Sequence, residues 1–148
     1  MTDLRDLYQE LVLDHGRNPR NFRVMTDATQ HSVGFNPLCG DKLSLFVRVD
    51  GDVVRDASFK GTGCAISTAA ASLLTESIKG KTLAQVRALL ADFLEMLTGN
   101  GSGDPTRLGK LAVFAGVRDF PVRVKCATLS WRTLEAALQG GTEPVTTE

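Results

Sequence analysis

The side chains best suited to chemistry are three thiols and one carboxylate, from Cys39, Cys64, Cys126 and Asp41. Cys39 and Asp41 stand two positions apart, with a glycine between them and Pro37 ahead of them. Proline fixes φ and glycine tolerates positive φ, so this stretch is typical of a sharp loop in which both side chains turn toward one point. Zinc accepts thiolate sulfur and carboxylate oxygen as tetrahedral ligands. We therefore expect these four side chains to converge on one metal ion.

Each cysteine also has a simpler interpretation, because free cysteine is commonly a small buried hydrophobe. The spacing alone is weak support for metal, since the sequence contains no CxxC pair. Iron–sulfur sites usually take four cysteines, and a carboxylate ligand would make a cluster labile. Zinc is therefore the expected cofactor, with iron or a labile iron–sulfur cluster as the alternative.

Composition narrows the classes of partner and compartment. Over 148 residues, 17 basic and 17 acidic side chains cancel, and no basic stripe is present, so nucleic acid is not an expected partner. No apolar run approaches the ~18 residues of a membrane span, so no membrane is expected either. The first residues lack the pattern of a signal peptide, which predicts a cytoplasmic protein. In that compartment an odd number of cysteines favours metal binding or reactivity over disulfides.

Hydrophobic periodicity predicts the elements that must position the four side chains. Helices are expected over residues 3–15, 65–78, 82–97, 108–114 and 122–138, and strands over 31–35, 42–49 and 53–60. Asp50-Gly51 is a strong hairpin signal between the last two strands. This order predicts an α+β fold in which a small three-stranded antiparallel sheet is packed on one side by about five helices. We expect a single domain over residues 1–140 and a flexible C-terminal tail over residues 141–148.

The predicted elements place the candidate residues near one sheet edge. The loop of residues 36–41 joins the first two strands, and residues 61–63 leave the third strand, so Cys64 opens a helix close to that loop. A helix N-terminus favours thiolate over thiol at Cys64. Cys126 is brought in by the last helix.

Three charged residues close to these segments have two readings each. His15 is either a further ligand or a helix-end histidine, and its position before Gly16 favours the second reading. Arg123 and Lys125, beside Cys126, are either a solvated face or cationic neighbours that lower a thiol pKa; we favour the latter.

Three segments together resemble the IscU/NifU N-terminal family of iron–sulfur cluster assembly proteins: Asn-Pro-Leu-Cys-Gly-Asp at 36–41, Gly-Thr-Gly-Cys-Ala-Ile-Ser at 61–67 and Val-Lys-Cys-Ala at 124–127. Residues 13–22 are similar too, so the resemblance covers nearly the whole chain. Within the family the chain is most similar to the SufU type. The Gly/Ser/Asp/Pro segment around residues 98–107 lengthens the span between the last two cysteines, and Lys125 stands where IscU-type scaffolds carry a histidine.

The resemblance implies a zinc site formed by Cys39, Asp41, Cys64 and Cys126. It also implies that Cys39 accepts persulfide sulfur from a SufS-type cysteine desulfurase, while Asp41 helps hold the metal as a ligand is released. Downstream iron–sulfur assembly machinery would be further partners. If the transfer is enzymatic, the protein is a zinc-dependent sulfurtransferase. Two alternatives stay open: a scaffold that builds a labile iron–sulfur cluster and passes it to apo-proteins, and a structural zinc domain that acts only as an interaction module.

Overall fold

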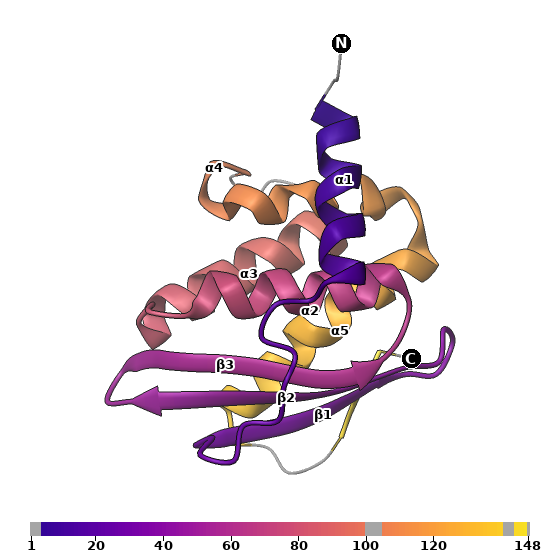
Figure 1. The fold of residues 1–148 in the computed structure, drawn as a ribbon. Coiled ribbons are helices and arrows are strands. Elements are labelled where there is room, and N and C mark those ends of the chain that lie inside the picture. The colour runs from indigo at the N-terminus through magenta and orange to yellow at the C-terminus, as the bar shows by residue number, and fades with distance from the viewer. Residues whose placement is uncertain (1–3, 100–104, 141–143, 148) are drawn as a thin grey trace.

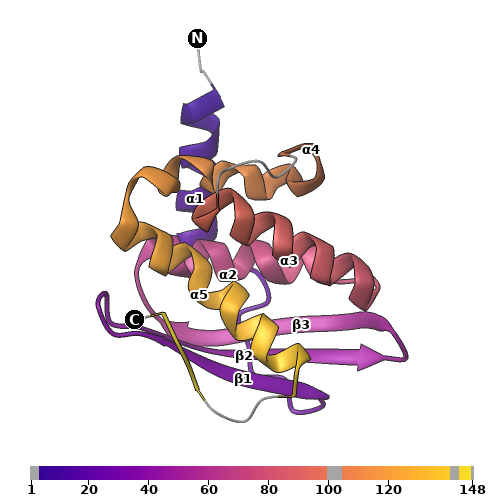
Figure 2. The ribbon, with the colours of Figure 1, turned by 180° about the vertical axis from the view of Figure 1, so that it is seen from behind.

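The computed structural model describes residues 4–99, 105–140 and 144–147. Its helices are α1 (Leu4–Arg17), α2 (Ala65–Ile78), α3 (Leu83–Thr98), α4 (Pro105–Leu108), the 3₁₀ helix η1 (Gly109–Asp119) and α5 (Pro121–Leu138). Its strands are β1 (Gln30–Asn36), β2 (Asp41–Asp50), β3 (Val53–Thr62) and β4 (Val145–Thr146). The helices gather on one side of the sheet, as both views of the ribbon show (Figures 1 and 2). The single-domain α+β fold predicted from the sequence is confirmed.

The predicted antiparallel meander forms the body of the sheet. β2 pairs with both β1 and β3, and the β1–β2 register places Asn36 opposite Asp41 at the strand ends. Alternation along β2 buries Leu43, Leu45 and Val47 against the helices, as a period of two requires for a sheet with one covered face.

The sheet has a fourth strand that the sequence did not predict. β4 pairs in parallel with β1, opposite Gly34 and Phe35, and gives the mixed order β3-β2-β1-β4. The expected three-stranded antiparallel sheet is therefore wrong in strand number and type. A backbone hydrogen bond from Thr147 to the Phe35 carbonyl, 3.1 Å long, extends this pairing. The division into a domain over residues 1–140 and a flexible tail over residues 141–148 stays a prediction, although its residues 145–146 belong to the sheet.

Most predicted helices are confirmed with small changes at their ends. α2 spans the predicted residues, and α3 begins after Thr82, whose side chain forms a capping box with Gln85. The short helix predicted over residues 108–114 is helical in the structure, but as the end of α4 followed by the 3₁₀ helix η1, which runs on to Asp119. Gly109 has a φ of 56°, a left-handed conformation that ends an α-helix. The Gly/Ser/Asp/Pro segment around residues 98–107 lies partly outside the described residues, which omit 100–104.

Close packing between β1 and α5 fixes the two elements that carry Asn36 and Cys126. Gly34 on β1 faces α5, and a Cβ atom at this position would lie 2.1 Å from Thr133 Oγ1. Glycine is therefore needed for the helix to approach the strand this closely. On the other side of α5, Trp131 stacks on Phe93 of α3 with ring centroids 4.4 Å apart.

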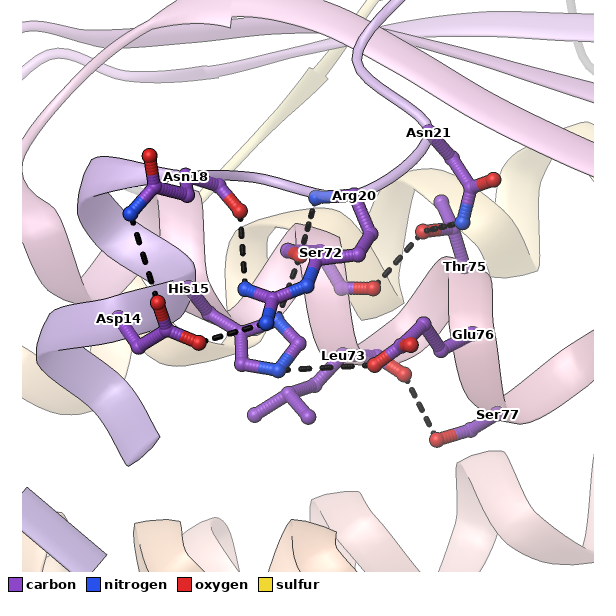
Figure 3. Close-up of polar contacts among 10 residues, drawn as sticks. All are labelled: Asp14, His15, Asn18, Arg20, Asn21, Ser72, Leu73, Thr75, Glu76 and Ser77. Atoms are coloured by element: carbon purple, nitrogen blue, oxygen red, sulfur yellow. Dashed lines mark hydrogen bonds and ion pairs between the residues drawn. The ribbon is translucent and has the colours of Figure 1, made fainter. Parts of the chain in front are cut away.

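A buried polar cluster, which we call the His15 cluster, joins α1 to α2 (Figure 3). His15 is 2% exposed, and its Nδ1 lies 2.6 Å from Ser72 Oγ. Ser72 Oγ also accepts the backbone N–H of Arg20 at 2.8 Å, while His15 Nε2 faces Glu76 at 3.5 Å. His15 is thus near the end of α1, as predicted, but its role in the structure is to tie the helix and the following loop to α2. Burial lowers the pKa of His15, and the nearby Arg20 adds to this.

Candidate metal centre

Three of the four predicted side chains meet at one end of the sheet. The donor atoms of Cys39, Asp41 and Cys126 all lie within 4.8 Å of one another, and we call these three residues the thiol cluster. Cys39 belongs to the β1–β2 loop, Asp41 begins β2, and Cys126 lies in the second turn of α5. The two sulfur atoms are 3.2 Å apart although 87 positions separate their residues.

The β1–β2 loop is the sharp turn that its sequence predicts. The backbone N–H of Cys39 donates to the Asn36 carbonyl at 3.3 Å, and that of Gly40 donates to Pro37 at 3.4 Å. Gly40 takes a φ of 71°, which suits a residue without a Cβ atom. The turn places Cys39 and Asp41 on the same side of the strand end, where the thiol of Cys126 lies.

Asp41 is 2% exposed and is held through both carboxylate oxygens. Oδ1 accepts the backbone N–H of Cys64 at 2.9 Å, and Oδ2 accepts Nδ2 of Asn36 at 3.0 Å. A Cβ atom on Gly63 would come within 2.6 Å of Asp41 Oδ1. Gly63 therefore allows the segment after β3 to close over the carboxylate, and the aspartate has little freedom to move.

Cys64 lies beside the thiol cluster but is not part of it. As the N-cap of α2, its Sγ accepts the backbone N–H of Ser67 at 3.4 Å. This capping contact turns the thiol toward the helix N-terminus, which the sequence predicted as its location. Cys64 is still close enough to Cys126 to contribute to the raised pKa of that thiol.

Cys126 is fully buried, and its thiol pKa lies well above the ordinary value. Burial is the main cause, and contacts with Cys39 and Cys64 add to it because clustered thiols disfavour charge on one another. The expectation that Arg123 and Lys125 lower a thiol pKa is therefore wrong for Cys126. Lys125 instead lines a surface hollow together with residues of α5 and β4.

The three donor side chains suit a metal ion that is bound mainly by thiolates. Ligand atoms of tetrahedral zinc with ~2.3 Å sulfur bonds are about 3.8 Å apart, and the thiol cluster lies within the range that such a group needs. Two thiolate sulfurs, which are soft ligands, and one carboxylate oxygen, which is a hard ligand, are both kinds that zinc accepts. No histidine belongs to the cluster among the described residues, so His15 is not one of its ligands.

Asn36 is a participant to which the sequence pattern assigned no role. It is fully buried, and its Nδ2 also approaches Cys126 Sγ at 3.5 Å. The only signal in the sequence was its place directly before Pro37 in the loop motif.

Comparisons with known proteins agree with this geometry. The family profile of the NifU-like N-terminal domain matches residues 7–127. The chain is 43% identical over 133 residues to the zinc-dependent sulfurtransferase SufU of Bacillus subtilis (strain 168), covering 90% of each chain. It is 37% identical over 139 residues to the iron–sulfur cluster assembly scaffold protein IscU of Streptococcus pyogenes serotype M1, covering 94% of this chain and 87% of that one.

Solved structures show the same fold. A crystal structure described as an iron–sulfur cluster assembly scaffold protein for the SUF system, from Fervidobacterium islandicum AW-1, superposes with a TM-score of 0.84. It is 34% identical and covers 92% of this chain and 99% of its own. A NifU-like protein from Brucella abortus, at a TM-score of 0.82 and 21% identity, supports the fold alone, with 93% and 95% covered. With its profile match, its thiol cluster and these relatives, the chain belongs to the NifU-like N-terminal domain family of iron–sulfur cluster assembly proteins.

Proposed function

We propose that this protein is a zinc-dependent sulfur acceptor, which takes persulfide sulfur from a SufS-type cysteine desulfurase and passes it into iron–sulfur cluster assembly. The observation that carries the proposal is the thiol cluster, in which Cys39, Asp41 and Cys126 converge from three elements. The sequence relationship to the Bacillus subtilis protein named as a zinc-dependent sulfurtransferase supports the choice of metal and reaction.

Cys39, Asp41, Cys64 and Cys126 are the residues proposed to hold the metal. Zinc, when bound, would keep the thiols deprotonated at neutral pH. Asp41 is already fixed by its two hydrogen bonds. Cys64 would join the set once its thiol leaves the Ser67 amide, and that contact, 3.4 Å long, is weak because sulfur is a weak acceptor.

Cys39 is the proposed sulfur acceptor because its position differs from that of the other thiols. It is partly exposed in a loop, whereas Cys126 is buried within α5 and Cys64 caps α2. The Cys39 thiolate would attack the terminal sulfur of the partner's cysteine persulfide. A new sulfur–sulfur bond forms on Cys39 while that of the partner breaks, and the electron pair leaves on the partner's cysteine as thiolate. No outside oxidant or reductant is needed, and Asp41 keeps its place while the loop moves.

The test is to react the protein with a desulfurase and cysteine, and then to locate the persulfide by mass spectrometry under non-reducing conditions. We expect the extra sulfur on Cys39, and we expect Cys39→Ala to abolish stimulation of desulfurase turnover. Lys125→Ala is the matched control, because its side chain lies in a surface hollow, and it should change stimulation little. Sulfur on Cys64 or Cys126 with Cys39 still a free thiol would overturn the assignment. Normal stimulation by Cys39→Ala would remove the acceptor role.

A second candidate function is a scaffold on which a labile iron–sulfur cluster is built and passed to apo-proteins. The relatives named as IscU scaffold proteins, such as that of Streptococcus pyogenes, favour it. Anaerobic incubation with iron and sulfide should then give a brown protein whose visible absorption disappears on transfer to an apo-protein. A structural zinc domain that only mediates assembly would instead keep Cys39 inert to alkylation, which its partial exposure argues against.

A further inference from the structure

Asn36 occupies an unusual place for an uncharged amide. It ends β1 with no exposed surface, and its Nδ2 is directed at Asp41 Oδ2, 3.0 Å away, and at Cys126 Sγ, 3.5 Å away. Its Oδ1 is buried and has no hydrogen-bond partner in the part of the chain that the structure describes. One side chain thus contacts two members of the thiol cluster, Asp41 and Cys126, which are 85 positions apart in the sequence (126 minus 41) and belong to β2 and α5.

Folding alone does not explain an asparagine here. A buried polar atom left without a partner destabilises the fold, and Asn36 Oδ1 carries this cost, which an apolar side chain of the same shape would not. What the amide offers, and a leucine does not, is two N–H donors on one nitrogen. A carboxylate and a thiolate are both acceptors, and they become fully anionic when they bind a metal ion.

We propose that Asn36 is a positioning residue of the metal centre, whose two amide N–H groups hold the Asp41 carboxylate and the Cys126 thiolate in place. The inference rests on the proposed function for the presence of a metal, but it concerns only residues of this chain. Hydrogen bonds from outside the ligand set orient the ligands, and losing one typically weakens metal binding by about 10- to 100-fold. Here one residue would orient a ligand from the sheet and a ligand from α5 together.

The position is prepared by packing that is separate from the cluster itself. Asn36 pairs with Asp41 in the β1–β2 register, so the two side chains start from neighbouring backbone positions. Gly34, two residues earlier, brings α5 against β1. The amide is therefore placed between Asp41 and Cys126 by the backbone and does not depend on metal to reach them.

The test uses the zinc-loaded chain and its cobalt(II) derivative, with Asn36→Leu and Asn36→Ala as variants. Ser32→Ala is the matched control, since Ser32 is also buried on β1 with a hydroxyl that has no partner among the described residues. We expect both Asn36 variants to release zinc to a chromophoric chelator with an affinity lower by about 10- to 100-fold. The thiolate-to-cobalt band should move to longer wavelength, because a thiolate without its hydrogen bond gives up electrons more easily. Ser32→Ala should change neither.

Thermal unfolding of the metal-free variants separates positioning from folding. Losing the Asn36 amide leaves the buried Asp41 Oδ2 without its partner, so we expect the metal-free Asn36 variants to unfold at a somewhat lower temperature and to stay folded under the conditions of the zinc assay. If both Asn36 variants kept zinc and the cobalt spectrum unchanged, the positioning role would be overturned. A drop in metal-free stability that accounts for the whole loss of zinc would also overturn it, and Asn36→Ala provides this comparison if the leucine variant does not fold. An unmodified chain without any thiolate-to-cobalt band would instead overturn the proposed function, and the inference with it.

Discussion

The His15 cluster and the thiol cluster are built alike but differ in whether their buried polar groups have hydrogen-bond partners. Each gathers buried side chains from segments far apart in sequence. In the His15 cluster Ser72 Oγ accepts the Arg20 N–H and also lies 2.6 Å from His15 Nδ1, so each of these buried polar groups has a partner (Figure 3). In the thiol cluster two sulfurs lie 3.2 Å apart, and the oxygen of Asn36 has no partner among the described residues.

The difference indicates that the His15 cluster stabilises the fold, whereas the thiol cluster is a site available for a ligand. The His15 cluster needs no further ligand, because the His15 ring, the Ser72 hydroxyl and the Arg20 N–H are partners of one another. The thiol cluster brings two sulfur atoms and a carboxylate together, and burial raises the pKa of the Cys126 thiol. A cation would supply what this second cluster lacks. The same comparison implies that the fold does not depend on that cation, and four experiments test it.

The largest effect is expected from chelation of zinc. We expect a tightly bound zinc, one per chain, whose removal exposes Cys39 to alkylation and leaves the helical far-UV signal in place. The physical reason is the core between sheet and helices, including the stacked Phe93 and Trp131, which contains no thiol cluster residue. Circular dichroism with mass spectrometry of alkylated peptides is the measurement. Collapse to coil on chelation would break the comparison, because small zinc domains unfold without their metal.

Asp41→Ala should weaken metal binding next most strongly. The change removes a candidate ligand and also the acceptor for the Cys64 N–H and for Asn36. We expect zinc affinity to fall at least about 10-fold, as for loss of an orienting partner, measured by competition with a chelator. Asp52→Ala, an exposed aspartate in the β2–β3 turn, is the control. Equal zinc affinity in both variants would exclude Asp41 from the site.

Ser72→Ala should change stability without changing metal binding. It leaves the His15 ring and the Arg20 N–H without their buried partner, which costs about 1–3 kcal/mol of unfolding free energy. Ser77→Ala is the matched control on the same helix, since its hydroxyl donates to the Leu73 carbonyl one turn earlier and the change leaves the His15 cluster intact. Urea unfolding and zinc competition, run on both variants, give the two readouts. A loss of zinc affinity in Ser72→Ala would show that the two clusters are coupled.

The smallest effect is the pH dependence that His15 contributes. Its pKa is lowered in the folded state, first by burial and then by Arg20, against opposing effects of Glu76 and Asp14. The unfolded chain therefore binds the proton more readily, and stability present above the ordinary value of 6.5 is lost as the pH falls below it. The metal-free chain should show this loss by urea unfolding between pH 7 and pH 5, and His15→Gln should show less of it. An identical pH dependence in both would contradict the lowered pKa.

Much of the fold follows from local pattern, and the turn and strand signals also bring Cys39 and Asp41 to the end of the sheet where Cys126 lies. Alternation in residues 42–49 predicts β2, and the turn residues around Cys39 predict the loop that carries the thiol. β4 has only two residues, too few to show any period. Its pairing with β1 depends on the direction that the chain takes after α5. The sequence also could not show that the Cys64 thiol caps α2 or that Asn36 contacts both Asp41 and Cys126. These contacts depend on tertiary structure, which local sequence pattern does not report.

The short strand β4 also has a consequence for solubility. Without it, the edge of β1 at Gly34 and Phe35 would present unpaired backbone groups to other chains. Open strand edges of this kind favour pairing between molecules and aggregation. A chain shortened to residue 140 would keep every thiol but lose β4. Any tendency of that chain to associate would then come from the exposed edge of β1 and not from the thiol cluster.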